Sequence, residues 1–477
     1  MFKSWKSKYP ESWFSCNPGV NGFLPVNSPL ERLPEKYNII NRLLEEMKIT
    51  QFDSNNDGGL LNQNKFADTI DKELPLYDLS EEEDIELLSG LFRDYCFMSS
   101  AYSLETSHYF LKDGVYGTAR DTLPVSLSEP LLILSQKLKV LPWLDYAYGY
   151  GLNNAKLIDE GMDKGLHTSY KTIRMFNGIP SESGFINTHV AMVSYSPELL
   201  KYQQDILENV SLITNPSDNY NKIELFNNLC KSLNDHHSIF LKIISSLHQM
   251  WGACKKTEYL SFRTFIMGHT GNSGMYPDES IDFTRKDGSV EKHSYRGETG
   301  AQDSLIPSID SLFQINYPCN KLTEYLFDLR KYRPKDHQEY IEYNKNMANE
   351  LNLVETIGKD PKCSLALFKN LNLLRLFRKK HWNLTKIYII KNTKHPVATG
   401  GTPITTWLPN QLGATIETML KVDKFIANGQ SILNDQENNE YETIRLELKE
   451  HYESLIDEVG SLQESFSKQE HESFLNR

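Results

Sequence analysis

Apolar residues recur every three or four positions over residues 371–390, which predicts an amphipathic helix. The apolar face of this helix consists of Leu374, Phe377, Leu384 and Tyr388. His381 lies on the same face. A buried imidazole is costly unless its ring nitrogens are satisfied, by polar groups of the protein or by a metal on one side. Taken alone, the pattern favours a core histidine bonded to a backbone carbonyl.

The same periodicity runs through most of the chain, whereas the strict alternation of a half-buried strand is scarce. The clearest further helical patterns cover residues 36–48, 185–200, 222–250 and 305–313. One of them carries a second histidine, His189, on an apolar face with Phe185 and Met192. Its simplest interpretation is again a satisfied core or capping residue. The fold class predicted from these patterns is all-α.

Three local patterns lead to further predictions. Ser80, with Glu83 three residues later, forms a capping box that is expected to open a helix through Cys96. Residues 273–298 are polar and contain glycines, so we expect a loop. Two adjacent histidines at 236 and 237 cannot both face one metal from a helix, and we expect both on the surface.

The stretch from residue 431 to the end is acidic and amphipathic. It carries 12 acidic and 4 basic residues, a net charge of −8 out of −12 for the whole chain. Its apolar positions nevertheless recur at three and four, so a helix is expected whose stripe packs on the body or on a second copy of itself. The protein is therefore expected to be a monomer or a homodimer, with this helix as a possible contact.

Composition excludes several classes of function. The net charge is −12 and no Lys/Arg-rich run is present, which argues against nucleic acid or an anionic membrane as partner. No apolar run approaches 18 residues and no signal-peptide core is found, so a cytoplasmic protein without a membrane span is expected. Six cysteines lie far apart without a Cys-x-x-Cys pair, which fits reduced thiols and excludes a thiolate metal site of the usual spacing.

Two stretches carry candidate binding chemistry. Arg263 lies among Tyr259, Phe262 and Phe265, where an arginine usually packs its stem and pairs a carboxylate of the protein or of a ligand. The turn at residues 399–402 is rich in backbone N–H and hydroxyl donors and could close over a polar ligand. It has no lysine and is too short for a P-loop.

Eight stretches occur between about residues 20 and 420: GFLPVNSPLERLPEKY, LSQKLKVLPWLDYA, GFINTH, FRTFIMG, GAQDSLIPSIDSLF, LRKYRPKDH, FRKKHWNLTKIYI and ATGGTPITTWL. In this order they resemble the indoleamine 2,3-dioxygenases, haem enzymes that open the indole ring of tryptophan. The resemblance implies a small N-terminal domain over a larger helical haem domain. We expect these at residues 1–170 and 171–430, followed by the acidic helix at 431–477.

The resemblance implies haem b as cofactor, O₂ as co-substrate, an indole amino acid as substrate and N-formylkynurenine as product. On the haem side it implies His381 as the proximal iron ligand, Arg378 and Asp310 as a supporting pair, and Gly300 and Ala301 over the haem. On the substrate side the implied residues are Tyr146, Phe185, His189, Tyr259, Arg263, Thr299, Gly300, Thr399 and Gly400. Arg263 would bind the substrate carboxylate, and the turn at 399–402 would close on the amino acid.

Two residues depart from the family pattern. His189 falls where the mammalian enzymes have a small hydroxyl residue, and bacterial relatives and the tetrameric tryptophan dioxygenases are similar to this chain in having a distal histidine. A neutral imidazole there could accept the indole N–H and orient the ring. Glu258 stands where the family usually has a pocket aromatic. A carboxylate is costly in a dry pocket unless it is paired or turned outward, so this position bears on the substrate.

Three alternatives remain open at this point. The chain could be a haem oxygenase of the same superfamily acting on a modified tryptophan in secondary metabolism. It could be a non-catalytic haem protein in which His381 and His189 ligate both faces of the iron. It could also be a helical scaffold without cofactor that dimerises through its tail.

Overall fold

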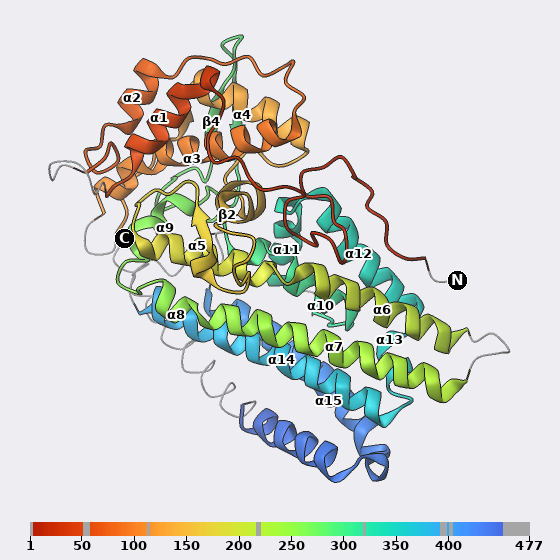
Figure 1. Ribbon diagram of the computed structural model, residues 1–477. Helices are drawn as coiled ribbons and strands as arrows, with labels where there is room; N and C mark the ends of the chain where they lie inside the picture. The colour runs from red at the N-terminus through yellow and green to blue at the C-terminus, as the bar shows by residue number, and fades with distance from the viewer. Residues whose placement is uncertain are drawn as a thin grey trace.

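The computed structural model describes residues 3–50, 58–111, 115–215, 221–317, 321–391, 398–399 and 404–451. Helices dominate these ranges, so the predicted all-α class is confirmed. Figure 1 shows a group of helices from the first part of the chain above a layer of long helices from the second part. Within the described ranges, no helix combines the length and the apolar character needed to cross a membrane.

The upper group consists of α1 (Asn38–Met47), α2 (Phe66–Glu73), α3 (Ile85–Tyr109) and α4 (Val125–Leu138). Its centre is α3, which is buried along almost its whole length. Asp84 caps α3, because its carboxylate accepts hydrogen bonds from the backbone N–H of Glu86 (3.0 Å) and Leu87 (3.2 Å). The predicted start at Ser80 is therefore wrong by one turn, since Asp84 offers an equally good cap next to the apolar run.

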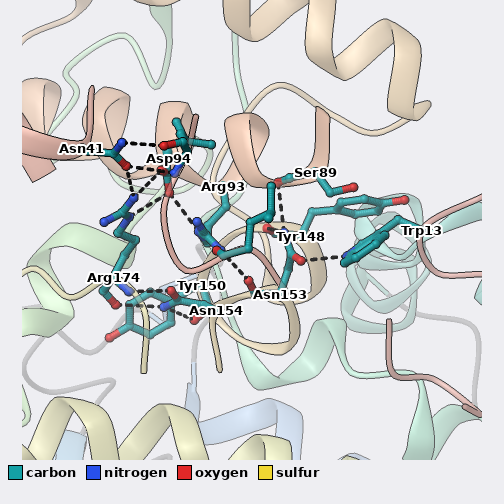
Figure 2. A network of polar contacts seen from close by, with 12 residues as sticks. Trp13, Asn41, Ser89, Arg93, Asp94, Tyr148, Tyr150, Asn153, Asn154 and Arg174 are labelled. Atoms are coloured by element: carbon teal, nitrogen blue, oxygen red, sulfur yellow. Dashed lines mark hydrogen bonds and ion pairs between the residues drawn. The ribbon is translucent and has the colours of Figure 1, made fainter. Parts of the chain in front are cut away.

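A buried charge cluster on α3 ties the upper group to the chain that leads into the lower layer (Figure 2). The Asp94 carboxylate accepts hydrogen bonds from Arg93 Nε (2.9 Å) and from Arg174 Nη2 (2.7 Å). Burial alone would raise the pKa of Asp94, but the two guanidinium groups lower it below its ordinary value. Asn41 of α1 accepts a further bond from Arg174 (3.1 Å), so three segments meet at one ion cluster.

The few strands are short. Strand β1 (Thr122–Leu123) pairs in parallel with β4 (Ile281–Thr284), and β4 pairs antiparallel with β5 (Val290–His293). A second pair, β2 (Ala155–Leu157) and β3 (Tyr170–Thr172), is antiparallel. The β4–β5 hairpin occupies the segment predicted as a loop, so that prediction is wrong. Strand β5 has no buried face and therefore leaves no apolar alternation to detect.

The lower layer and its surroundings contain the remaining helices. They are α5 (Pro180–Val193), α6 (Ser196–Thr214), α7 (Lys222–His248), α8 (Met250–Ala253), α9 (Leu260–Arg263), α10 (Leu305–Leu312), α11 (Lys321–Leu329), α12 (Lys335–Glu350), α13 (Leu353–Ile357), α14 (Pro361–Thr385) and α15 (Ile404–Asn428). In this layer α6 packs along α7, α7 along α14, and α14 along α15 (Figure 1). The predicted helix at 371–390 is the second half of α14 with its continuation.

The contact between α7 and α14 includes a buried polar pair. His236 of α7 is fully buried, and its Nδ1 lies 2.7 Å from Oδ1 of Asn370 on α14. The prediction that His236 lies on the surface is therefore wrong. Its partner is 134 residues away in sequence, so the neighbouring residues gave no indication of it.

The acidic stretch forms a helix over residues 435–451 and docks on α14 of its own chain, below that helix in Figure 1. Tyr441 and Leu448 are buried there. Lys369 of α14 pairs with Glu440 at 2.9 Å, and Arg375 with Glu447 at 3.2 Å. Over its described part, the apolar stripe thus packs on the body.

Candidate active site

The apolar face of α14 that carries His381 borders a cavity in the lower layer. Asp360 caps the start of α14, because its carboxylate accepts a hydrogen bond from the N–H of Cys363 (2.9 Å), and a wider turn at Lys386–Ile390 follows the helix. Burial lowers the pKa of His381 to about 4. The imidazole is therefore neutral at ordinary pH, which is the form that binds iron.

The cavity has a volume of about 250 Å³ and separates α14 from α5 and α10. Its lining combines apolar and cationic side chains. Of the predicted site residues, those that line it are Tyr146, His189, Gly300, Ala301, Asp310, Arg378 and His381. Residues that are 235 positions apart in sequence, from Tyr146 to His381, thus meet around one space.

Arg378 lies one turn before His381 and forms a buried ion pair with Asp310 of α10. Its Nη2 lies 2.7 Å from each carboxylate oxygen of Asp310. Tyr317 donates a hydrogen bond of 2.5 Å to the same carboxylate, and Arg378 also contacts Tyr317 and Thr415. The nearby carboxylate raises the pKa of Arg378 although burial opposes it. The predicted association of Arg378 with Asp310 is thus present as a salt bridge.

Two cationic side chains that line this cavity fit an anionic cofactor. Nε of Arg378 and Nη1 of Arg333 are buried, and neither bonds to any group in the described part of the chain. A buried guanidinium N–H without an acceptor is costly, whereas a carboxylate placed there would satisfy it. Haem carries two propionate carboxylates, so these donors and the His381 imidazole form a suitable set for it.

Residues 297–303 form the wall beside His189. Arg333 fixes this segment, because its side chain donates to the carbonyls of Asp303 (2.8 Å) and Ala301 (2.9 Å). A Cβ on Gly300 would lie 3.3 Å from Cε1 of His189. The absence of a side chain at Gly300 therefore keeps the space next to the His189 ring open.

The wall opposite His381 is aromatic. His189 and Phe185 project from one face of α5, with ring centroids 5.0 Å apart, and Tyr146 lies 5.6 Å from His189 in an edge arrangement. Burial, together with a smaller contribution from the nearby His381, lowers the pKa of His189 to about 4. A neutral His189 offers one donor and one acceptor to whatever lies in the cavity.

A second cavity of about 120 Å³ meets the first at His189, Gly300 and His381. The predicted residues that line it are Phe185, His189, Tyr259, Thr299, Gly300, His381 and Thr399. The Thr399 carbonyl accepts a hydrogen bond from the N–H of Gly268 at 3.3 Å, which holds this residue against the cavity wall. The structure thus separates a larger space beside Arg378 from a smaller one beside Tyr259.

Comparison with known proteins identifies the family. Residues 17–456, nearly the whole chain, match the family described as Indoleamine 2,3-dioxygenase. The chain belongs to the indoleamine 2,3-dioxygenase family. It is therefore a haem-dependent dioxygenase that uses O₂ and acts on tryptophan.

Individual indoleamine 2,3-dioxygenases are similar to this chain at low identity. An indoleamine 2,3-dioxygenase of Saccharomyces cerevisiae is 25% identical over 392 residues, covering 79% of each chain. One from Aspergillus nanangensis is 24% identical, covering 78% of this chain and 85% of its own. A 6-hydroxytryptophan 2,3-dioxygenase of Fusarium equiseti is 26% identical, covering 68% of this chain and 71% of its own.

Two of the predicted site residues are not found at the cavities. Arg263 lines neither cavity, and Gly400, predicted in the closing turn, lies outside the described residues. Arg263 is fully buried at the end of α9 and its Nη1 lies 3.4 Å from the Tyr116 hydroxyl. It is one turn after Tyr259, which lines the smaller cavity.

Glu258 does not enter the substrate space of this dioxygenase. Its carboxylate accepts hydrogen bonds from Ser181 Oγ (2.5 Å) and Lys255 Nζ (3.0 Å), and its side chain is 33% exposed. These bonds lower the pKa of Glu258 below its ordinary value. The carboxylate is thus both paired and turned away, as its chemistry requires.

Three site residues were missed by the sequence reasoning: Tyr317, Arg333 and Glu298. Tyr317 completes the Arg378–Asp310 pair. Glu298 lines the smaller cavity and is 3% exposed. The only sequence signal at Glu298 is its position beside the small-residue segment, and nothing in that polar stretch indicates that the side chain is buried.

Proposed function

We propose that this enzyme opens the C2=C3 bond of the indole ring of L-tryptophan with O₂ to give N-formylkynurenine. The observation that carries the proposal is the pair of neutral histidines, His381 and His189, on opposite walls of the space where the two cavities meet. One can bind a haem iron and the other can face the substrate.

We propose haem b as the cofactor, with His381 as its proximal ligand. Arg378 and Arg333 would donate hydrogen bonds to its propionates, and Asp310 would hold Arg378 in place. Ala301 and Gly300 would lie over the ring. When bound, the haem supplies the ferrous iron that makes O₂ reactive toward an indole.

The side chains of the opposite wall would position the substrate. Neutral His189 would accept a hydrogen bond from the indole N–H, and Phe185 with Tyr259 would pack on the ring. Arg263 would bind the substrate carboxylate, for which its side chain has to turn into the smaller cavity beside Tyr259. Thr399 would cover the amino-acid part of the substrate. These contacts orient the indole toward the oxygen and exclude water, and no protein base is needed.

Catalysis on a ring-substituted tryptophan is the second candidate. It is favoured by the similarity to a 6-hydroxytryptophan 2,3-dioxygenase of Fusarium equiseti. Product analysis with tryptophan and with 6-hydroxytryptophan separates the two candidates, because the physiological substrate should have the higher kcat/KM.

The central experiment measures haem content and product in wild type and in His381→Ala. We expect one haem per chain in the wild type, a five-coordinate reduced form that binds CO, and formylkynurenine from tryptophan. His381→Ala should lose most of its haem, whereas His248→Ala, on the exposed end of α7, should keep it. Full haem retention in His381→Ala would overturn the assignment, and a six-coordinate reduced protein that rejects CO would favour the bis-histidine alternative.

We also propose a division into domains at about residues 170 and 430, and a cytoplasmic monomer. The cysteines that the structure describes are free thiols, as in proteins of a reducing compartment. The helix at 435–451 uses its apolar stripe on its own α14, which supports a monomer over a dimer formed through that stripe.

A further inference from the structure

Glu298 is a buried carboxyl group that faces the smaller cavity. It is 3% exposed and lines that cavity together with Tyr259, Thr299 and Thr399. No group in the described part of the chain donates a hydrogen bond to it. Carboxyl groups with this degree of burial normally have protein partners, as Glu182 does with three backbone N–H groups. Among the residues that the structure describes, none uses the hydrogen-bonding capacity of Glu298.

The charges around Glu298 leave it in need of a cation. Burial, and secondarily the carboxyl of Asp145, raise its pKa to about 8. Asp145 is itself buried and is occupied by the N–H groups of Tyr148 (2.7 Å) and Gly149 (3.0 Å). A positive group that enters the cavity beside Glu298 would offset the free-energy cost that burial and the repulsion by Asp145 impose on its ionised form.

A cation and a carboxyl group both act electrostatically on Tyr259, which lines the smaller cavity. Burial is the main cause of the raised pKa of Tyr259; the charge of Arg263 lowers that pKa and the charge of Glu298 raises it. A free amino acid carries one carboxylate and one ammonium group, and these two side chains have the complementary charges.

The backbone places Glu298 at the amino-acid end of the proposed substrate. Gly297 packs so closely on the segment of Thr399 that a Cβ on Gly297 would lie 2.5 Å from the Thr399 carbonyl oxygen. Glu298 follows directly, so its carboxyl group and Thr399 line the same wall.

We propose that Glu298 binds the α-ammonium group of the amino-acid substrate and thereby favours indoles that carry an ammonium group over indoles that lack one. This inference rests on the proposed function, in which Arg263 binds the carboxylate. The ammonium would donate a charge-assisted hydrogen bond to the Glu298 carboxylate. The chemical class selected is an indole with a protonated amine on its side chain.

Ligand titrations of the ferric holoprotein, followed by the haem absorbance, test this. The ligands are L-tryptophan, tryptamine, which keeps the ammonium, and indole-3-propionate, which lacks it. In Glu298→Gln we expect the Kd of L-tryptophan and of tryptamine to rise roughly 10- to 100-fold, the worth of one hydrogen bond between charged groups. The Kd of indole-3-propionate should change by less than about 3-fold.

Glu258→Gln is the matched control, because it removes a carboxylate one residue before Tyr259 that lines neither cavity. It should leave all three Kd values unchanged. An equal loss for all three ligands in Glu298→Gln, or no loss for any of them, would overturn the inference. If Glu298→Gln does not retain haem, Glu298→Asp replaces it, because the shorter acid should also weaken tryptamine more than indole-3-propionate.

Failure of the proposed function gives a different result. In that case the wild type produces no formylkynurenine from tryptophan, whatever the ligand titrations show. If the wild type oxidises tryptophan and Glu298→Gln discriminates ammonium ligands as well as the wild type does, only the role of Glu298 is excluded.

Discussion

Burial decides what the two facing histidines can do. His189 and His381 both have pKa values lowered to about 4, so both are neutral across the ordinary pH range. An imidazolium at either position could neither bind iron nor accept an indole N–H. The sequence located both residues on apolar faces, and those faces lie on opposite sides of one space.

The first prediction concerns the pH dependence of turnover. Because the pKa of His189 is lowered, its neutral form persists as the pH falls, and kcat/KM for tryptophan should show no inflection from His189 between pH 7 and pH 5. It should fall as the pH approaches 4. His189→Ala should lower kcat/KM about 10-fold or more, the worth of a hydrogen bond, and keep its haem. A wild-type inflection near pH 6.5 that disappears in His189→Ala would contradict the assigned pKa.

For single residues, the sequence could predict some partners in the folded chain and not others. The association of Arg378 with Asp310 came from the family resemblance and is present as a buried ion pair. The burial of Glu298 could not be predicted, because the residue before it, Gly297, packs on Thr399, which is 102 residues away in sequence. Glu258 attracted attention as an unusual residue in the pattern, but Ser181 holds it away from the cavity.

Helix α14 shows how far periodicity determines an element. Its apolar face, its approximate extent and the position of His381 all follow from spacing at three and four. The face that meets α7 contains Asn370, which pairs with His236, and no local pattern distinguishes this buried pair from a solvated one. Periodicity predicts which side of a helix is apolar, whereas buried polar pairs depend on the neighbouring helix.

The second prediction tests the pair between α7 and α14. Burial lowers the pKa of His236 to about 4, below its value of about 6.5 in an unfolded chain. Between these values the unfolded state binds a proton that the folded state does not, so the free energy of unfolding falls as the pH falls. Because of this residue, the free energy of unfolding of the wild type should fall by about 2 kcal/mol between pH 7 and pH 5.

His236→Gln removes this titration and keeps a donor for Asn370. Urea unfolding at pH 7 and pH 5 gives the free energy of unfolding of both proteins. Relative to the wild type, the variant should be about 2 kcal/mol more stable at pH 5 than it is at pH 7. His248→Gln, at an exposed position, is the matched control and should show no such shift. An unchanged difference for His236→Gln would mean that His236 is protonated in the folded state.

At the scale of the whole molecule, the acidic tail is part of the fold. Its described helix buries Tyr441 and Leu448 against α14, the helix that carries His381. Tyr441 also donates a hydrogen bond of 2.6 Å to Asp423 of α15. The tail thus joins the two helices that form one side of the lower layer.

The third prediction follows from this docking. Deletion of residues 434–477 should lower the free energy of unfolding by about 3–5 kcal/mol, because two large side chains lose their burial and the facing surface of α14 becomes exposed. The double variant Glu440→Gln/Glu447→Gln removes only the partly exposed ion pairs and should cost less than about 1 kcal/mol. Urea unfolding measures both, and similar losses in the two variants would show that charge rather than apolar packing holds the tail.

The Asp94 cluster connects the upper group of helices to the wall that faces His381. Arg174, which it holds, is followed by Phe176, Asn177 and Gly178, whose N–H groups bind Glu182 in the first turn of α5. The same helix carries His189 on its next turns. The upper group of helices therefore holds in place the wall that carries His189. A substitution that weakens the Asp94 cluster should consequently lower the activity of the enzyme, although Asp94 is far from the site. Substitutions in the Asp94–Arg174 cluster and at Glu182 should therefore change both the stability of this enzyme and its preference among substrates.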